Sequence, residues 1–284
     1  MVACGMAGSS ILPGNHVHAS EGSGLQAISN AGKQLEKLTF FDCSCTLGTR
    51  QIKYPASYYR LEDHLRKMKH YGIDKALACH TAACAYNQTD GNRMLMEMVN
   101  AHAQLQGKWV VLPHHTGEFP KPDELRRQLK SAGTSCVTIM PRSHVFSTEK
   151  WVCGGLFAML EKCKTPLFVS SGELGYDALR NVLSAYPGLR VVLTDLNCSC
   201  ARNLYPLLET FQHLYIETIG FKVFGGIEDV CRRFGARRLI FGTSAPLYSG
   251  AGAVGMVTYA DISHNEKQMI ASGNLEKLIK EVAL

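Results

Sequence analysis

The sequence predicts an α/β protein, a (β/α)8 TIM barrel, and three observations predict it. Eight short apolar runs recur along the chain, segments with helical spacing lie between them, and several of these segments end at a glycine. The runs show no polar alternation, as expected for strands of a parallel sheet that is covered on both faces. Eight such units in roughly 245 residues match the size of a (β/α)8 barrel.

The apolar runs predict the strands in chain order. They are 40–41, 75–78, 109–112, 136–140, 167–169, 191–193, 214–216 and 239–241. A doubly wound sheet is the competing architecture, but it usually carries a glycine-rich first turn. Here the first turn, Asp42–Gly48, contains no G-x-G-x-x-G pattern. We therefore favour the barrel.

The segments between these runs carry apolar residues three or four positions apart, which predicts helices with one buried face. Leu61, Leu65 and Met68 are the first such set, and Leu95, Met98 and Val99, followed by Leu105, are the second. Glycine tolerates the left-handed conformation that closes a helix. The glycines placed to do so are Gly72, Gly107, Gly133, Gly188 and Gly235. Near the C-terminus, Ser263 and Glu266 have the spacing of a capping box.

The first 38 residues differ from the rest because they are rich in Gly, Ser and Ala and show no sustained period. We expect residues 1–38 to be a poorly ordered N-terminal extension and residues 39–284 to form the barrel. His16 and His18 lie in this stretch without a strand to hold them rigid, so we interpret them as loop residues. We expect no export signal and no membrane span, since no apolar run approaches roughly 18 residues.

Charge and cysteine content narrow the functional classes. The net charge is +6 and the basic residues are scattered, which gives no reason to expect nucleic acid as a partner. The eleven cysteines are an odd number and include no C-x-x-C pair, which argues for reduced thiols and a cytoplasmic protein. They do include two C-S-C triplets, at 43–45 and 198–200.

In a (β/α)8 barrel, functional residues lie where the strands end. The candidates at these positions are polar, and four of them are histidines. They are Cys43, Cys45, His80, His114, His115, Glu118, Arg142, His144, Ser170, Glu173, Asp195, Glu217 and Ser244.

Several phrases of the sequence resemble the amidohydrolase superfamily of metal-dependent hydrolases and decarboxylases. They are Phe41-Asp42 with Leu47-Gly48, Tyr71–Ala76, Pro166–Val169, Phe234–Thr243 and Ser272–Leu278. The resemblance implies a metal-dependent-hydrolase-like barrel that acts on small, usually anionic molecules, and it leaves a homodimer open. It also implies metal-binding histidines after strands one, five and six and an aspartate after strand eight.

This chain departs from that pattern at every one of those positions. The corresponding residues are Cys43, Cys45, Ser170, Asp195 and Ser244. A serine hydroxyl is a poor zinc ligand and a poor proton acceptor near neutral pH. We therefore expect a degenerate metal site and no cofactor.

Our first hypothesis is a hydrolase, or a related decarboxylase or lyase, that works without a metal on a small anionic molecule. The predicted catalytic residues are His114, His115, Glu118 and Asp195. The predicted ligand-binding residues are Cys43, Cys45, His80, Arg142, Ser170 and Ser244, with Arg142 as the anion anchor.

Two alternatives stay open. One is a non-catalytic barrel that binds a small ligand or a partner protein, which accounts for the lost ligands without new chemistry. The other is a zinc or other divalent-metal site rebuilt from thiolates. Cys43 and Cys45, two apart on a strand, would face the same way and could meet Asp195 or His80.

Overall fold

The computed structural model describes residues 37–50 and 57–284, and residues 1–36 and 51–56 lie outside that description. Leu38–Leu284 form one compact unit. The extension predicted over residues 1–38, with His16 and His18, falls almost wholly outside the described residues and stays a prediction. Among the described helices, none is both long and apolar enough to cross a membrane.

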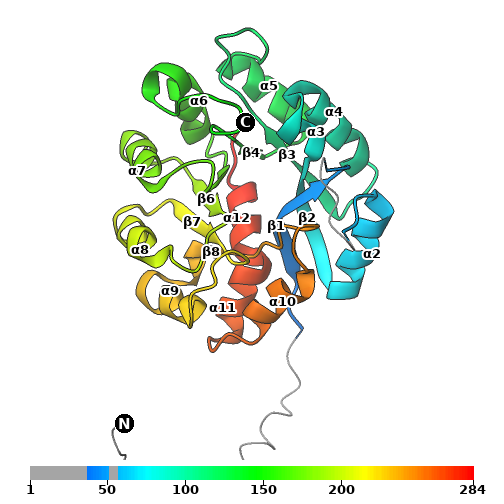
Figure 1. The fold of residues 1–284 in the computed structure, drawn as a ribbon, viewed down its shortest axis with the longest axis vertical. Coiled ribbons are helices and arrows are strands. Elements are labelled where there is room, and N and C mark those ends of the chain that lie inside the picture. The colour runs from blue at the N-terminus through cyan, green and yellow to red at the C-terminus, as the bar shows by residue number, and fades with distance from the viewer. Residues whose placement is uncertain (1–36, 51–56) are drawn as a thin grey trace, which may run out of the picture. The chain divides into compact units, whose positions relative to one another are not determined.

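The predicted (β/α)8 barrel is confirmed (Figure 1). The eight parallel strands follow one another in chain order, and each pairs with the next. They are β1 Phe40–Leu47, β2 Ile73–His80, β3 Leu105–Val110, β4 Cys136–Thr138, β5 Leu167–Ser170, β6 Val191–Thr194, β7 Leu214–Glu217 and β8 Leu239–Ile240. The amide of Cys43 donates to the carbonyl of Phe241, and that of Thr46 donates to Ala245, so the chain after β8 closes on β1.

Helices surround the strands on the outside of the barrel (Figure 1). They are α2 Leu61–Tyr71, α3 Thr81–Ala85, α4 Gln88–Val99, α5 Pro122–Ala132, α6 Lys150–Lys162, α7 Tyr176–Ala185, α8 Ala201–Thr210, α9 Gly226–Phe234, α10 Gly250–Thr258, α11 His264–Gln268 and α12 Asn274–Lys280. Gly72 and Gly133 close α2 and α5 with φ of 71° and 66°, as predicted. The predicted capping box at Ser263 and Glu266 opens α11.

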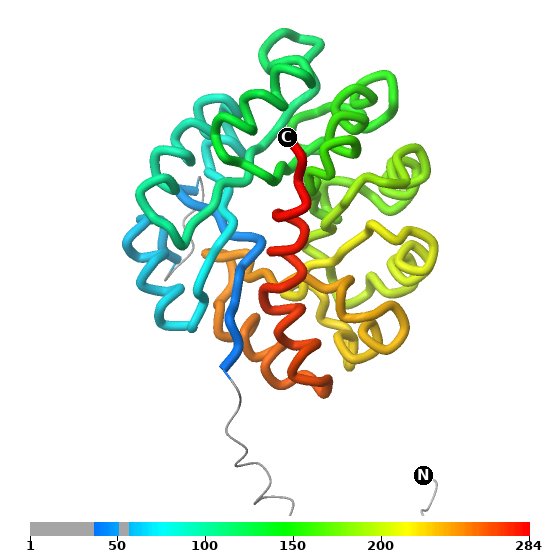
Figure 2. The backbone as a smooth tube through the Cα atoms, turned by 180° about the vertical axis from the view of Figure 1, so that it is seen from behind, coloured from blue at the N-terminus to red at the C-terminus, as the bar shows by residue number. Residues whose placement is uncertain are grey.

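One end of the barrel is closed by the chain's own C-terminus. Figure 2 shows the last helix crossing that end. Leu275 and Leu278 of α12 join an inner apolar cluster with residues that face the barrel axis. Lys75, near the start of β2, pairs with Glu276 at 3.0 Å, which places α12 at the N-terminal ends of the strands. The C-terminal ends of the strands, where the functional sites of such barrels lie, are at the opposite end.

The third strand begins earlier than predicted. Leu105 continues the helical spacing of α4 in the sequence, yet α4 ends at Val99 and Leu105 opens β3. Gly107 therefore lies inside the strand and does not close a helix. A Cβ at Gly107 would lie 2.8 Å from the sulfur of Met96, so the missing side chain lets α4 approach β3 closely.

Gly91 of α4 lies in close contact with α3. A Cβ added there would lie 2.0 Å from the backbone nitrogen of Ala83, so α3 must move to admit it. We expect Gly91→Ala to destabilise the protein by about 1–3 kcal/mol through overpacking. Gly252→Ala is the matched control, because that helical glycine has open space around it and should gain about 0.5–1 kcal/mol. Urea unfolding of both variants checks the contrast, and equal effects would refute this account of Gly91.

Candidate active site at the barrel mouth

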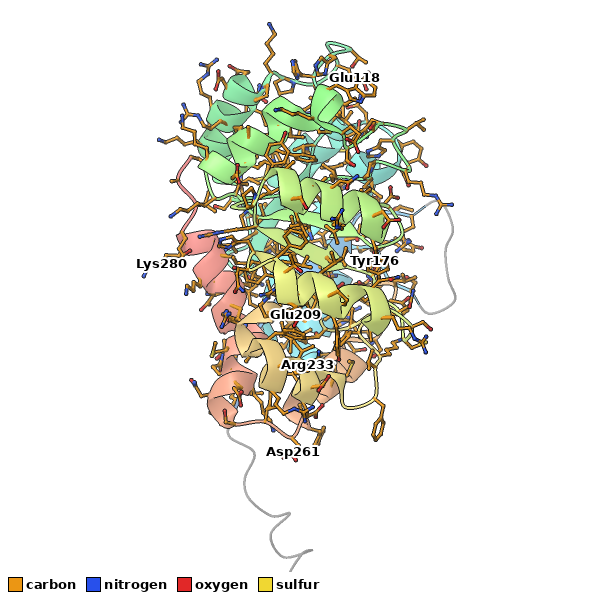
Figure 3. The ribbon with its side chains drawn as sticks, turned by 90° about the vertical axis from the view of Figure 1, so that its left-hand side faces the viewer. Glu118, Tyr176, Glu209, Arg233, Asp261 and Lys280 are labelled. Atoms are coloured by element: carbon orange, nitrogen blue, oxygen red, sulfur yellow. The ribbon has the colours of Figure 1, made fainter. Side chains whose placement is uncertain are left out.

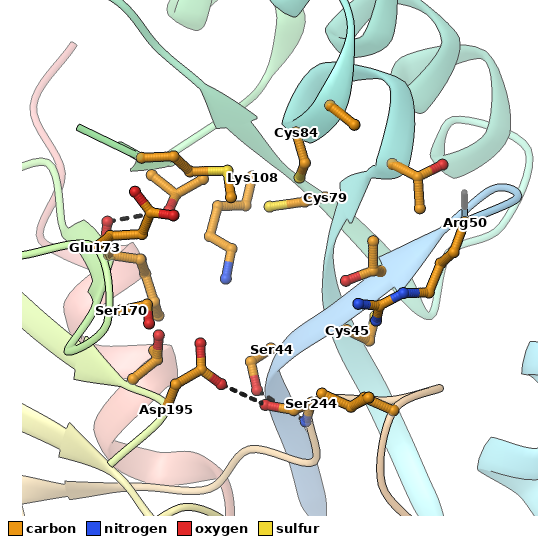
Figure 4. Close-up of a pocket in the computed structure, with 18 of the residues that line it drawn as sticks. Ser44, Cys45, Arg50, Cys79, Cys84, Lys108, Ser170, Glu173, Asp195 and Ser244 are labelled. Atoms are coloured by element: carbon orange, nitrogen blue, oxygen red, sulfur yellow. Dashed lines mark hydrogen bonds between the residues drawn. The ribbon is translucent and has the colours of Figure 1, made fainter. Parts of the chain in front are cut away.

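A cavity of about 400 Å³ lies at the C-terminal ends of the strands. Residues from β1 to β6 and the loop after β8 line it (Figure 4). Its polar lining residues include Ser44, Thr46, Arg50, Lys108, Thr138, Ser170, Glu173, Asp195 and Ser244, and Cys45, Cys79 and Cys84 add three thiols. Such a concave site with converging polar groups is the expected form of a small-molecule pocket.

Lys108 places a positive charge on the floor of this cavity. Its side chain projects from β3 and is 5% exposed. The ammonium donates a hydrogen bond of 2.8 Å to the carbonyl of Cys43 and lies 4.1 Å from the ring centroid of Phe168. Burial lowers the pKa of Lys108, but the charges of groups such as Cys79 and Glu217 outweigh it and leave that pKa raised. Lys108 is therefore an ammonium ion at neutral pH.

Glu217, the last residue of β7, lies behind the cavity wall and is fully buried. The Ser44 hydroxyl donates to its Oε1, the Ser244 hydroxyl reaches the same oxygen at 3.4 Å, and the Asp195 amide donates to Oε2 at 3.3 Å. Burial raises the pKa of Glu217 to about 7, and the charges of Asp195 and Asp42 add to that rise. Glu217 can therefore hold a proton near neutral pH, and two hydroxyl groups connect it to the cavity.

Asp42 fixes the wall that carries these hydroxyl groups. Its carboxylate accepts hydrogen bonds from the Thr243 amide at 2.9 Å, from the Thr243 hydroxyl, and from the Ser44 amide at 3.0 Å. These bonds join β1 to the segment after β8 and orient Ser44. Gly242, in the same segment after β8, leaves room for the side chain of Glu217. A Cβ at Gly242 would lie 2.2 Å from Oε1 of Glu217.

Asp195 and Ser244 lie side by side at the cavity with unusual backbone conformations (Figure 4). Their φ angles are 51° and 50°, in the left-handed region that residues with side chains rarely adopt. The Ser244 hydroxyl donates to Oδ1 of Asp195 at 3.5 Å (Figure 4). Backbone strain of this kind costs about 1–3 kcal/mol and concentrates at functional sites. The geometry brings together the predicted Asp195, Ser170 and Ser244.

The two cysteines of the first triplet are separated rather than paired. The register between β1 and β2 shifts between Asp42 and Cys45, which breaks the simple alternation. Cys43 lies in the inner apolar cluster, whereas Cys45 lines the cavity and its thiol donates to the carbonyl of Leu77 at 3.7 Å. Burial raises the pKa of both thiols well above its usual value, so both remain neutral thiols.

Several other predicted residues lie away from the cavity lining. His114 and His115 stack on each other, with centroids 4.2 Å apart, in the loop after β3. Glu118 lies at the periphery of the molecule (Figure 3). The catalytic roles predicted for these three residues stay predictions that their positions do not support.

His80 and Arg142 contribute to the frame around the cavity. Nδ1 of His80 accepts from the Ala82 amide at 3.1 Å, so its ring caps α3. Arg142 is exposed, and its amide donates to Oε2 of Glu173 at 2.9 Å. Neither side chain is among those that line the cavity. Their predicted ligand-binding roles also stay predictions.

The residues that the sequence alone missed are Lys108, Arg50 and Ser44. Lys108 was not among the predicted site residues because the third strand was predicted to begin at Trp109, one residue after it. Arg50 follows β1, and Figure 4 shows its guanidinium group at the cavity. A lysine within the register of a buried strand is the signal that could have identified Lys108, because lysine is almost never buried without a role for its charge.

Comparisons with solved structures agree with this architecture. No protein-family model and no curated protein matches the sequence. A 5-carboxyvanillate decarboxylase from Novosphingobium aromaticivorans superposes with a TM-score of 0.72 at 15% identity, over 86% of this chain and 97% of that one. A 2,6-dihydroxybenzoate decarboxylase from Rhizobium gives 0.69 at 14% identity, over 86% and 99%. A candidate amidohydrolase from Staphylococcus aureus gives 0.66 at 13%, over 86% and 100%. The predicted resemblance is therefore confirmed at the level of the fold.

These structures correct the expectation about cofactors. Solved decarboxylases with this fold hold manganese, so the expectation that such a barrel has no cofactor is wrong. The donors at the mouth of this barrel do not fit that ion as they are placed. Cys43 and Cys45 are neutral thiols in different surroundings, and Lys108 places a positive charge near them. Manganese prefers oxygen ligands. Within residues 37–50 and 57–284, no three His, Cys, Asp or Glu side chains cluster as a metal site.

Proposed function

We propose that the protein is an enzyme that acts on a small carboxylic acid in the barrel-mouth cavity, most directly as a decarboxylase. The observation that carries the proposal is the position of the Lys108 ammonium at the same cavity as the Glu217–Ser44–Ser244 hydrogen-bond chain. A buried cation favours an anionic ligand, and a buried acid with a pKa of about 7 can supply a proton. Proteins that share this fold include decarboxylases, which also supports the proposal of a decarboxylase.

Decarboxylation needs an electron sink and a proton. The bond between the substrate carbon and its carboxylate breaks, carbon dioxide leaves, and the electron pair stays on that carbon until a proton arrives. Lys108 would stabilise the negative charge of the substrate, with Arg50 as a second cation at the rim. The hydroxyl of Ser44 or Ser244 would pass a proton from Glu217 to the carbon, and solvent would reprotonate Glu217.

Hydrolysis is the second candidate, and Asp195 favours it. Its carboxylate lines the cavity, where it could take a proton from an attacking water molecule. Lys108 would then stabilise the oxyanion that develops on the carbonyl group. The two candidates use the same cavity but opposite proton movements, since decarboxylation needs a donor and hydrolysis needs an acceptor.

A substrate panel tests the proposal. We expect the full chain to release labelled carbon dioxide from a hydroxybenzoate such as carboxyl-labelled 2,6-dihydroxybenzoate, assayed both with and without added manganese. Glu209→Gln removes an exposed carboxyl group of α8, outside the cavity lining, and is the control that should retain full activity. Turnover of lactones or amides with no carbon dioxide release would favour the hydrolase. A rise in melting temperature with these ligands but no turnover of any of them would instead identify a binding protein.

A further inference from the structure

Two thiols of the barrel mouth, Cys79 and Cys84, lie together beside Lys108. Cys79 is the penultimate residue of β2 and Cys84 lies in α3, and both line the cavity. They pack in one small apolar cluster with Ala83 and Val110. Figure 4 shows their sulfur atoms facing each other at the cavity wall. The proposed decarboxylation uses neither of them.

The environment of Cys79 differs from that of the other buried thiols. A hydrogen bond from the Cys84 thiol, aided by the charge of Lys108, lowers the pKa of Cys79 to about 7 against the opposing effect of burial. By contrast, burial raises the pKa of Cys136 to about 12. The thiolate is the nucleophilic form of cysteine, so Cys79 is the thiol that this fold prepares for reaction. Cys84 is in contact with it and can act as the resolving thiol.

We propose that Cys79 and Cys84 form a reactive dithiol site that exchanges with low-molecular-weight disulfides such as oxidised glutathione and closes to an internal disulfide. The Cys79 thiolate attacks one sulfur of the glutathione disulfide and releases one glutathione thiolate. The Cys84 thiol loses its proton to solvent, attacks the mixed disulfide at Cys79, and releases the second glutathione. Glutathione disulfide gains two electrons, and the protein pair loses two.

Closure of this disulfide would change the cavity that holds the anion site. It removes the negative charge that faces Lys108 and fixes α3 to the end of β2. The dithiol proposal does not depend on the proposed decarboxylase activity, because its chemistry involves only the two thiols and the added disulfide.

Peptide mapping of the full chain after treatment with oxidised glutathione tests the site. We expect a peptide that joins Cys79 to Cys84, formed roughly tenfold faster than glutathione attaches to the exposed Cys198. In Cys84→Ser the resolving thiol is missing, so glutathione should remain attached at Cys79. Cys198→Ser is the matched control and should still form the internal disulfide at the wild-type rate.

Two outcomes of the peptide mapping would overturn the proposal. Glutathione attached at Cys198 while Cys79 and Cys84 stay unmodified in folded protein would overturn the proposal. Formation of the Cys79–Cys84 link only in urea would do the same, because the folded cavity would then not prepare the pair. Neither measurement involves turnover, so failure of the decarboxylase proposal leaves this test intact.

Discussion

Replacing Lys108 with methionine is expected to weaken the binding of 2,6-dihydroxybenzoate by roughly 30-fold to 5,000-fold, which corresponds to about 2–5 kcal/mol. Methionine is similar in length but neutral, so the substitution removes the charge and leaves most of the volume. The loss should be large because Lys108 as a residue is 5% exposed, so the interaction of its charge with an anion is little screened by water. Isothermal titration calorimetry measures the difference directly.

Two controls identify the charge as the cause. Resorcinol, which lacks the carboxylate, should bind the wild type and Lys108→Met with similar affinity. Lys280→Met removes an exposed lysine at the far end of α12 and should change neither ligand's affinity (Figure 3). Lys108→Gln keeps a donor for the Cys43 carbonyl and shows whether any loss reflects misfolding. Equal affinity of folded Lys108→Met and wild type for the carboxylate would remove Lys108 from the site.

Glu217→Gln is expected to lower kcat by roughly 100-fold to 10,000-fold with little change in ligand affinity, because glutamine has no acidic proton to give. In the wild type, the group must be protonated to act as the donor, and its pKa is about 7. Turnover should therefore fall as the pH rises above about 7. A pH profile of kcat checks this, with Glu209→Gln as the control. A flat profile across neutral pH would mean that Glu217 is not the proton donor.

Glu217→Gln should also change how protein stability depends on pH, which can be measured without a substrate. Burial raises the pKa of Glu217 from 4.5 to about 7, so the folded state holds its proton more firmly than the unfolded state. Its stabilising contribution is fully present below pH 4.5 and is lost as the pH rises through 7. The loss amounts to about 3 kcal/mol. Urea unfolding gives the free energy of unfolding of Glu217→Gln minus that of the wild type. This difference should be more positive at pH 8 than at pH 5.

The sequence predicted the barrel because its strands are uniformly apolar, which is a local signal. Each of the eight runs became a strand, and Gly72 and Gly133 ended helices where their left-handed conformation was needed. Leu105 was assigned to a helix because three- or four-residue spacing continues across the loop that follows α4. Local periodicity carried no information about that loop, which separates Val99, the end of α4, from Leu105, the start of β3.

The site was harder to predict because it depends on which residues converge in space. Asp195, Ser170 and Ser244 lie at the barrel mouth, as their places at the ends of the predicted strands suggested. Ser170 ends β5, Asp195 follows β6, and Ser244 lies in the loop after β8. The roles predicted for them stay predictions. The separation of Cys43 from Cys45 depends on a register shift between β1 and β2 that pairing alone reveals. The acidity of Glu217 depends on burial and on neighbours distant in the chain, such as Ser44 and Asp42. None of these features has a sequence motif.

A crystal structure of the full chain with 2,6-dihydroxybenzoate would show whether Lys108 binds the carboxylate of a ligand in the cavity. We expect the ligand in the barrel-mouth cavity, with its carboxylate within hydrogen-bond distance of the Lys108 ammonium and its ring near the hydroxyl groups of Ser44 and Ser244. A ligand bound elsewhere, or bound in the cavity with its carboxylate turned away from Lys108, would contradict it.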